Sequence, residues 1–593
     1  MMNSGWMNRH LISTAGFLFF VLAIQMPAYT QASPKSRVSI LDNAKLKQWK
    51  FTKAGVGSLA RLESEGANVF QVTSQIASQY TYQLATKLPV KPGPYKKGEK
   101  LLLKFTAKSL SSSFETGEAK VLWQLKTGTD SRLWEDAVIS IASQWQTYYL
   151  PFEIPLNSKD DELSVVMQFG FPPQQFLIKE LSLDLYAKET SLQDLPKTQI
   201  TYPGMEAEAS WRKEAFARID SMRKGDFEIQ FYKDGQPLEN VALQVEMTDH
   251  QFNWGATVRA KDIVERPGDL QLLKENFNTA VLENDLKIKF WTKQTMPTTL
   301  KAMDLLKAKG LRLKGHVLIW PGFNHLPSQI IKHENNPEKV IEILNQHIRQ
   351  ILNETKGRID QWDVVNEAYT NKDLQRITGS EDALYNAFRF MKSQYPDVKR
   401  LVNEYGIISQ GGLNQTKREW YYNYIKRIDE NTDGAIDGIG IQSHIGTDLT
   451  PPVKVLEILD YYAQLGKSIS ISEFTLDVRD ENIRRMYTED FLIAAFSHPS
   501  VTDFIFWGFN NDASGRTDLF DRNGHAGSMG MAYQALVHGL WKTKAAGNTN
   551  ADGVWKGTGF YGSYNYTYTI NGQERKGKFK LAPGEDTVIR INL

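Results

Sequence analysis

The chain has 593 residues, a formal net charge of +2 and no cysteine. One hydrophobic core rarely serves a chain of this length, so we expect two to four domains. The near-neutral charge, without a long basic block, argues against a nucleic-acid-binding protein. Without cysteine the chain forms neither disulfide bonds nor a thiolate zinc site, and its stability must come from its core.

Residues 1–32 have the pattern of a secretory signal peptide. Arg9 and His10 precede an apolar run at 11–24, and small residues follow around Ala32. The alternative is a transmembrane anchor, but the run is shorter than the ~20 residues that span a bilayer. We therefore expect cleavage near Ala32, export of the mature protein to the periplasm, cell surface or medium, and no stable membrane insertion afterwards.

Residues 35–188 carry short alternating segments, such as 100–105, 119–124 and 163–170, between turns rich in Gly, Pro, Ser and Lys. Strands at this spacing without intervening helices predict an all-β sandwich. The polar, proline-containing stretch at 189–206 is predicted to be a linker.

Residues 207–545 are predicted to form a third, larger domain. Helical spacing at 211–223 leads into a strand at 226–232, which we expect to pair with 241–247 across the turn at Asp234-Gly235, giving a β-rich lead-in to about residue 250. Strands and amphipathic helical stretches, such as 339–352 and 381–394, then alternate. The predicted strands are 253–258, 279–282, 312–319, 361–366, 400–403, 438–442, 468–472 and 503–508.

Eight strands alternating with helices over roughly 300 residues fit an α/β protein with a (β/α)₈ barrel. The tail at 546–593 returns to β patterning, with many tyrosines and the turn pair Asn571-Gly572. We expect it to form a small β module appended to the barrel.

Two of the predicted barrel strands end in glutamates. Strand 361–366 delivers Asn366-Glu367, and strand 468–472 delivers Glu473. In a parallel α/β barrel such strand ends converge at the C-terminal face, where the active site lies. Hydrolysis of a glycosidic bond needs two carboxyl groups that flank it. Taken alone, a strand-end glutamate could equally pair with a neighbouring basic side chain, so the surrounding segments decide.

Those segments give a resemblance: residues 252–541 resemble the family-10 glycoside hydrolases, the β-1,4-xylanase family. The matching segments are 282–287, 314–320, 362–367, 403–405, 440–444, 471–473 and 506–508. Their order and spacing fit a single barrel.

The resemblance implies that Glu367 is the general acid/base and Glu473 the nucleophile of a retaining enzyme. Gln442 would then bond the acid/base and His444 the nucleophile, although a histidine at such a position could also be a satisfied core residue. Glu367 must be protonated at rest, so we expect partial burial and the charge of Glu473 to raise its pKa.

Glu283, Asn284 and Lys287 match residues that hold the sugar two units to the non-reducing side of the cut. Such a cluster taken alone would more often be a solvated loop. The family's matching positions at this site are Glu283, Asn284, Lys287, His316, Trp320, Asn366, Tyr405, Gln442, His444 and Trp507.

His316, Trp320, Asn366 and Trp507 match the walls of the subsite where the bond breaks, and Tyr405 lies in the matching segment of the fifth strand. For the two tryptophans, barrel core is the alternative.

Other residues near these motifs receive no catalytic role. We expect Trp362 and Asp363 to be structural, and we assign none to the carboxylates Glu404 and Asp477. Pro321 stands where many family members have a histidine. The loop at 510–520 lacks the second tryptophan that often covers the site. These departures leave the walls of the subsites open.

The N-terminal sandwich resembles the carbohydrate-binding jelly rolls that often accompany such enzymes, through 145–152 and 169–171. Candidate sugar-stacking residues are Trp49, Tyr80, Tyr82, Trp123 and Trp134, whereas Trp145 is expected in the core. A sandwich that has lost binding and merely caps the barrel is an equal alternative.

Together these features predict a secreted retaining endo-1,4-β-xylanase that needs neither cofactor nor metal and whose partner is xylan, plain or decorated. The alternatives are a retaining β-glucanase or mannanase on the same barrel, a non-catalytic xylan-binding protein, and a structural or adhesive role for the flanking β modules. The segment from Glu283 to Lys287 favours xylan, and the intact glutamate pair favours hydrolysis. Nothing in the sequence indicates an oligomeric state.

Overall fold

The computed structural model describes residues 37–62, 68–127, 130–159, 162–510 and 519–593, with the side chains of 127–137 left out. The predicted signal peptide and most of the 510–520 loop lie outside these ranges. Within them, none of the helices combines the length and the apolar character that crossing a bilayer requires.

The N-terminal region is a sandwich of two antiparallel sheets, as the sequence predicts. One sheet has the order β2-β3-β4-β11-β6-β9, with β1 paired to β11, and the other has the order β5-β10-β7-β8. The strands are β1 (Arg37–Ser39), β2 (Phe51–Lys53), β3 (Gly57–Arg61), β4 (Phe70–Ser74), β5 (Ala85–Lys87), β6 (Lys100–Ser112), β7 (Ala119–Thr127), β8 (Asp130–Ile141), β9 (Gln146–Glu153), β10 (Leu163–Gln168) and β11 (Gln174–Tyr186). Alternate residues such as Leu101, Leu103 and Phe105 of β6 and Val121 and Trp123 of β7 are buried in a common core.

The aromatic residues of the sandwich divide between core and surface. Tyr80 and Tyr82 are exposed, and their rings stack with centroids 5.2 Å apart. The expectation that Trp145 is core is wrong: it is 39% exposed, with the Lys179 ammonium over its ring, because it lies in the turn before β9 rather than on an inward strand face. The remaining candidates are Trp49 and Trp123, which are buried, and Trp134, which lies outside the described side chains.

The central region is a closed parallel barrel of eight strands, all within the described part of the chain, which confirms the predicted (β/α)₈ fold. The strands in barrel order are β15 (Asn253–Val258), β16 (Thr279–Leu282), β17 (Arg312–Ile319), β18 (Gln361–Asn366), β19 (Lys399–Glu404), β20 (Gly438–Ile445), β21 (Ser468–Leu476) and β22 (Val501–Phe506). Nearly all of their residues are buried, and short runs of apolar, Gly and Ser residues alternate with the helical stretches, which is why the sequence located them well.

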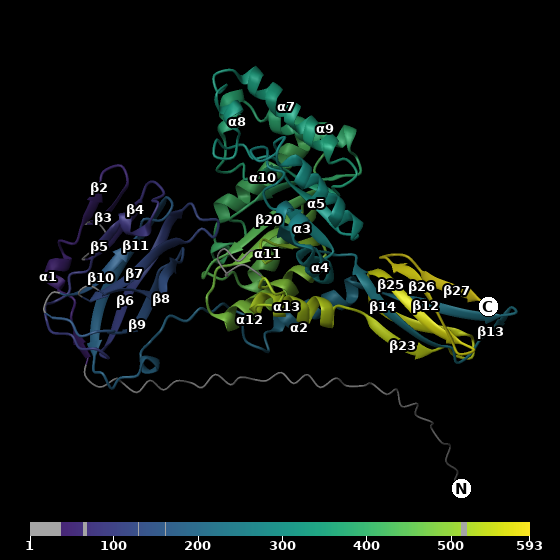
Figure 1. Ribbon diagram of the computed structural model, residues 1–593, viewed down its shortest axis with the longest axis horizontal. Coiled ribbons are helices and arrows are strands. Elements are labelled where there is room, and N and C mark those ends of the chain that lie inside the picture. The colour runs from purple at the N-terminus through teal and green to yellow at the C-terminus, as the bar shows by residue number, and fades with distance from the viewer. Residues whose placement is uncertain (1–36, 63–67, 128–129, 160–161, 511–518) are drawn as a thin grey trace, which may run out of the picture. The chain divides into compact units, whose positions relative to one another are not determined.

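Helices lie around the outside of the barrel (Figure 1). They are α3 (Ala260–Glu265), α4 (Pro267–Asn276), α5 (Met296–Ala308), α6 (Ser328–Ile331), α7 (Pro337–Glu354), α8 (Asp373–Thr378), α9 (Asp382–Gln394), α10 (Gln415–Asn431), α11 (Pro452–Ala463), α12 (Glu481–Phe496), α13 (Ser528–Tyr533) and the π-helical η4 (Gln534–Leu540). The shorter elements are α1 (Asn43–Leu46), η1 (Thr81–Gln83), η2 (Leu192–Asp194) and η3 (Gln410–Gly412), and α2 (Ser210–Met222) precedes the barrel. Each of the predicted helical stretches falls on a helix.

The C-terminal β module is built from two distant parts of the chain. One sheet joins β12 (Lys224–Lys233) to β13 (Gln236–Pro237), β24 (Val554–Phe560) and β27 (Thr587–Asn592). The other has the order β23 (Lys544–Asn548), β14 (Ala242–His250), β25 (Gly562–Ile570) and β26 (Gln573–Leu581).

The predicted pairing of strand 226–232 with 241–247 is therefore wrong. The chain that follows the turn contributes only the two residues of β13 to the sheet of β12, and β14 joins the opposite sheet. Each lead-in strand instead pairs with tail strands, because Phe227 and Met247 can share a core with Tyr564 only when both sheets close over it. The Asn571-Gly572 turn does join β25 to β26, with positive φ at both residues, as a tight hairpin requires.

Candidate active site

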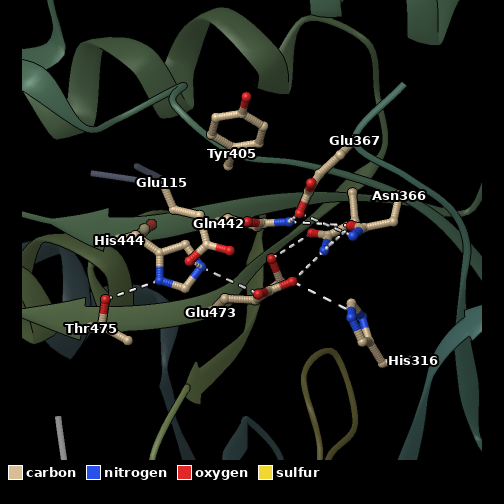
Figure 2. Close-up of polar contacts among 12 residues, drawn as sticks. Glu115, His316, Asn366, Glu367, Tyr405, Gln442, His444, Glu473 and Thr475 are labelled. Carbon is tan, nitrogen blue, oxygen red and sulfur yellow. Dashed lines mark hydrogen bonds and ion pairs between the residues drawn. The ribbon is translucent and has the colours of Figure 1, made fainter. Parts of the chain in front are cut away.

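The two predicted catalytic glutamates meet at the C-terminal face of the barrel, among side chains from neighbouring strands (Figure 2). Glu367 follows β18, Glu473 lies near the end of β21, and both are buried, at 7% and 4% exposed. Gln442 and His444, at the end of β20, lie next to them, as expected of strand ends in a parallel barrel.

Glu367 has a backbone conformation that few non-glycine residues adopt, with φ of +53°. The left-handed region costs an L-residue on the order of 1–2 kcal/mol and persists where surrounding contacts enforce it. Here the Glu367 N–H donates to the carbonyl of Asn403 at 2.9 Å, and its own carbonyl accepts from the N–H of Asn371 at 3.1 Å. The kink turns the side chain into the site, where Oε1 accepts hydrogen bonds from Gln442 Nε2 (3.0 Å) and Asn366 Nδ2 (3.1 Å).

Burial raises the pKa of Glu367 to about 8, with further contributions from the charges of Glu404, Glu473 and Glu115. The carboxyl is thus protonated at neutral pH, the state that a general acid needs. The cause expected from the sequence is only partly right. Desolvation raises the pKa of Glu367 most, and the charge of Glu404 raises it more than the charge of Glu473 does.

Glu473 lies among hydrogen-bond donors rather than acceptors. Asn403 Nδ2 donates to its Oε1 at 2.6 Å, and His444 Nε2 lies 3.3 Å from its Oε2. His316 Nδ1 is 4.0 Å from Oε1. These contacts orient the Glu473 carboxyl group toward the site, as a nucleophile needs.

His444 is a buried imidazole held at both ring nitrogens. Nδ1 lies 2.9 Å from Thr475 Oγ1, and Nε2 faces Glu473 and, at 3.5 Å, the carboxylate of Glu115. Burial lowers the pKa of His444, but the charges of Glu115, Glu473 and Glu367 outweigh it and raise that pKa to about 9. His444 is therefore an imidazolium at neutral pH, not the neutral core histidine of the alternative interpretation.

Asn403 connects the two glutamates, a role that the sequence analysis did not assign. Its Nδ2 donates both to Glu473 and, at 2.9 Å, to Asn366 Oδ1, while its Oδ1 accepts from Ser472 Oγ at 2.6 Å. The only sequence feature that could have indicated this role is the position of Asn403 in the matching segment 403–405.

Glu404, to which no role was assigned, forms a fully buried ion pair with Lys417 at 2.9 Å. It also accepts hydrogen bonds from the N–H groups of Tyr369 and Tyr405. Although it does not touch Glu367, it is the charged neighbour that contributes most to the raised pKa of Glu367. Its influence is electrostatic.

His316 is held by a second buried charge cluster. Its Nδ1 lies 2.9 Å from Asp363 Oδ2, and Asp363 Oδ1 pairs with Lys314 Nζ at 3.0 Å. Asp363 thus fixes the ring of His316, in line with its expected structural role. Trp507, half-buried after β22, packs edge-on against His316 with centroids 4.9 Å apart.

Asn284 and Lys287 are joined to each other on the β16 side of the site. Lys287 Nζ donates to Asn284 Oδ1 at 2.7 Å and lies 5.0 Å from the centroid of the Trp320 ring. A cavity of about 230 Å³ lies beside these residues. Glu283 pairs with Arg259 at 3.6 Å.

Trp320 is half-buried and does not belong to the barrel core. His325, which the sequence analysis missed, stacks on it at 3.5 Å with ring planes 4° apart, only a few residues after the position where Pro321 replaces a common histidine. Burial lowers the pKa of His325 to about 4, so it stacks as a neutral ring.

Tyr405 lies near the rim of the site (Figure 2). Its hydroxyl is 3.3 Å from Thr370 Oγ1, and Lys417 Nζ lies 3.2 Å from its ring centroid. Burial raises the pKa of Tyr405 to about 12, so its hydroxyl stays a neutral donor.

Fold and site together define a glycoside hydrolase on a (β/α)₈ barrel, with a protonated carboxyl and a carboxylate held among donors on the same face. Residues 243–538 match the sequence model of glycosyl hydrolase family 10. Through this barrel, the chain belongs to glycosyl hydrolase family 10.

Curated relatives also match this chain. The chain is 28% identical over 348 residues to endo-1,4-beta-xylanase A of Thermotoga maritima, and 27% identical over 337 residues to a beta-1,4-xylanase of Dictyoglomus thermophilum. It is 25% identical over 385 residues to the anti-sigma-I factor RsgI6 of Acetivibrio thermocellus. These matches cover 51%, 50% and 62% of this chain and 31%, 92% and 48% of the respective relatives, so the chain spans less than half the length of two of the three.

Among solved structures, xylanase 10B of Thermotoga petrophila in complex with xylobiose is similar, with a TM-score of 0.43 and 24% identity. That match covers 49% of this chain and 94% of the other.

Proposed function

We propose that this protein is an endo-1,4-β-xylanase that cuts the xylan backbone with retention of configuration. The observation that carries the proposal is the contrast between two buried carboxyl groups, with Glu367 protonated and Glu473 held by donors. The named activities of the Thermotoga and Dictyoglomus relatives support xylan as the substrate.

In the proposed first step, Glu473 attacks the anomeric carbon while Glu367 donates its proton to the departing sugar oxygen. The bond to the leaving sugar breaks as the bond to Glu473 forms, which yields a covalent glycosyl-enzyme. The ester no longer carries the charge of Glu473, so the pKa of Glu367 falls. Glu367 then takes a proton from the water that releases the sugar, and Glu473 leaves as the carboxylate.

Substrate would lie across the face of the barrel. Asn284 and Lys287 would hold the sugar two units to the non-reducing side of the cut, and Trp320, Trp507 and His316 would line the subsite next to the cut. Asn366 would bond a hydroxyl beside the reacting carbon. Glu283 would need to release Arg259 to reach the sugar.

Product analysis tests the proposal. Protein lacking residues 1–32 is incubated with linear xylan, arabinoxylan, cellulose and mannan, with Glu473→Ala as the matched control. We expect short xylo-oligosaccharides from the xylans only, and proton NMR of the nascent product should show the β-anomer. Release from cellulose or mannan would indicate the alternative glycanases, an α-anomer first would exclude the retaining mechanism, and binding of xylan without release would indicate a non-catalytic protein.

We also propose that the protein is exported after cleavage near Ala32, from the charge and hydrophobicity pattern of its first 32 residues. Mass spectrometry of the protein isolated from its producing cells tests this. A mature N-terminus near residue 33 is expected, and an intact Met1 in the exported fraction would contradict it.

A further inference from the structure

One carboxylate at the active site does not come from the barrel. Glu115 belongs to the loop between β6 and β7 of the N-terminal sandwich, residues 113–118, which we call the β6–β7 loop. Its Oε2 lies 3.5 Å from His444 Nε2, on the same nitrogen that faces Glu473. Figure 2 shows the side chains of Glu115 and Glu473 near the same edge of the His444 ring.

The β6–β7 loop is anchored to the barrel by buried contacts. Glu118 is 1% exposed and accepts hydrogen bonds from Thr447 Oγ1 at 3.0 Å and from the N–H of Asp448. Gln410 Nε2 donates to the carbonyl of Gly117 at 2.6 Å. Because a carboxyl group buried this deeply needs hydrogen-bond partners, these contacts hold the β6–β7 loop against the barrel.

Flanking strands of the sandwich add further contacts. Lys120 of β7 pairs with Asp477, and Ser143 Oγ donates to Asp448 Oδ2 at 2.9 Å. The barrel partners follow β19, β20 and β21, three consecutive strands of the barrel. The loop thus lies over the strand ends that carry Asn403, His444 and Glu473.

We propose that the N-terminal sandwich is part of the active site, and that Glu115 is a positioning residue for His444 and, through it, for the nucleophile Glu473. His444 Nε2 faces two carboxyl groups, that of Glu473 from the barrel and that of Glu115 from the sandwich. The expected effect of Glu115 on catalysis rests on the proposed hydrolase function, whereas its expected effect on the titration of His444 does not.

The charged groups that act on the His444 ring are Glu115 from the sandwich, Glu473 from β21 and Glu367 after β18; Thr475 contacts the other nitrogen. Glu115 is about half exposed, at 54% of its side chain, so it can be neutralised without loss of a buried contact. Removing the charge of Glu115 should lower the pKa of His444 and leave the side chains of His444 and Glu473 less firmly oriented.

The test is a histidine-selective ¹⁵N NMR titration of the full mature chain, with the His444 signal assigned from His444→Gln. In the wild type, His444 should titrate near pH 9. In Glu115→Gln the pKa of His444 should fall by roughly one unit, whereas Glu115→Asp should keep most of the shift because it keeps the charge. Glu189→Gln, at an exposed turn after β11, is the matched control and should leave His444 unchanged.

A second variant tests the anchoring. A Cβ at Gly446 would lie 1.7 Å from Glu118 Oε2, so Gly446→Ala should displace the β6–β7 loop and lower the pKa of His444 although Glu115 is intact. An unchanged His444 titration in both Glu115→Gln and Gly446→Ala would overturn the proposal.

Kinetics separate this inference from the proposed function. With an aryl β-xylobioside, Glu115→Gln should lower kcat severalfold and leave KM nearly unchanged. A titration shift in a protein that hydrolyses none of the glycans would keep the positioning of His444 and reject the xylanase. If the enzyme hydrolyses xylan but Glu115→Gln leaves the His444 titration unchanged, the xylanase is kept and the positioning role of Glu115 is rejected.

Discussion

Glu367 and Glu473 are buried to a similar extent on the same barrel face, yet their surroundings differ in kind. Glu367 lies near other carboxylates, and the two hydrogen bonds to its Oε1 come from neutral amides. Glu473 faces the imidazolium of His444 and the amide of Asn403. The difference teaches that burial alone does not assign acid or nucleophile; the sign of the neighbouring charges does.

The largest effect is expected from Glu473→Ala, because the variant removes the carboxylate that would attack the anomeric carbon. Activity should fall on the order of 10⁵-fold on both xylan and activated aryl xylosides. Initial rates on the two substrates measure this. A loss confined to xylan would mean that Glu473 is not the nucleophile.

Glu367→Ala should separate the two substrates. Hydrolysis of xylan should fall about 10²–10⁴-fold, the usual contribution of a general acid. The first step on an aryl glycoside with an acidic phenol should be nearly spared, because that leaving group needs no proton, and a burst of phenol should appear. Equal losses of the first step in the Glu367 and Glu473 variants would erase the contrast between the two sites.

Asn403→Ala tests the link between the sites. The variant removes one donor from Glu473 and one from Asn366, so we expect a loss of about ten- to a hundredfold in kcat, since a hydrogen bond to a charged group is worth roughly 1.5–3 kcal/mol. Thermal unfolding of the variant provides the control. A fold that melts like the wild type with full activity would show that the link is dispensable.

The pH dependence should reveal the smaller influence of Glu404. Glu367 works as an acid only while protonated, so kcat/KM should be maintained below and lost above about pH 8. Glu404→Gln removes a negative charge that raises this pKa, so the alkaline limb should move to lower pH, by up to about one unit. Glu404→Asp, which keeps the charge, should leave the limb near its original place, and an unmoved limb in both variants would contradict the electrostatic role.

The barrel and the catalytic pair were accessible from the sequence for a physical reason. Buried parallel strands give short runs of apolar and small residues, and Glu367 directly follows β18 while Glu473 lies near the C-terminal end of β21. Gln442 and His444 make the contacts expected of them, although catalytic roles stay predictions until the variants are measured.

What the sequence could not supply depends on distant segments. Glu115 precedes His444 by hundreds of residues in a separate sandwich, and no local pattern relates them. The strands β12 and β14 alternate like a hairpin, but their partners lie at the far end of the chain. The charge of Glu404 acts across space on Glu367, so no local sequence pattern shows its effect.

The split β module has a consequence for how this protein is made. As the chain leaves the ribosome, β12 and β14 emerge before the barrel, but their partners β24, β25 and β27 emerge only after it. Until then the nascent chain presents unpaired strand edges, which are templates for aggregation. The β module can therefore be completed by β27 only after the whole barrel has been synthesised.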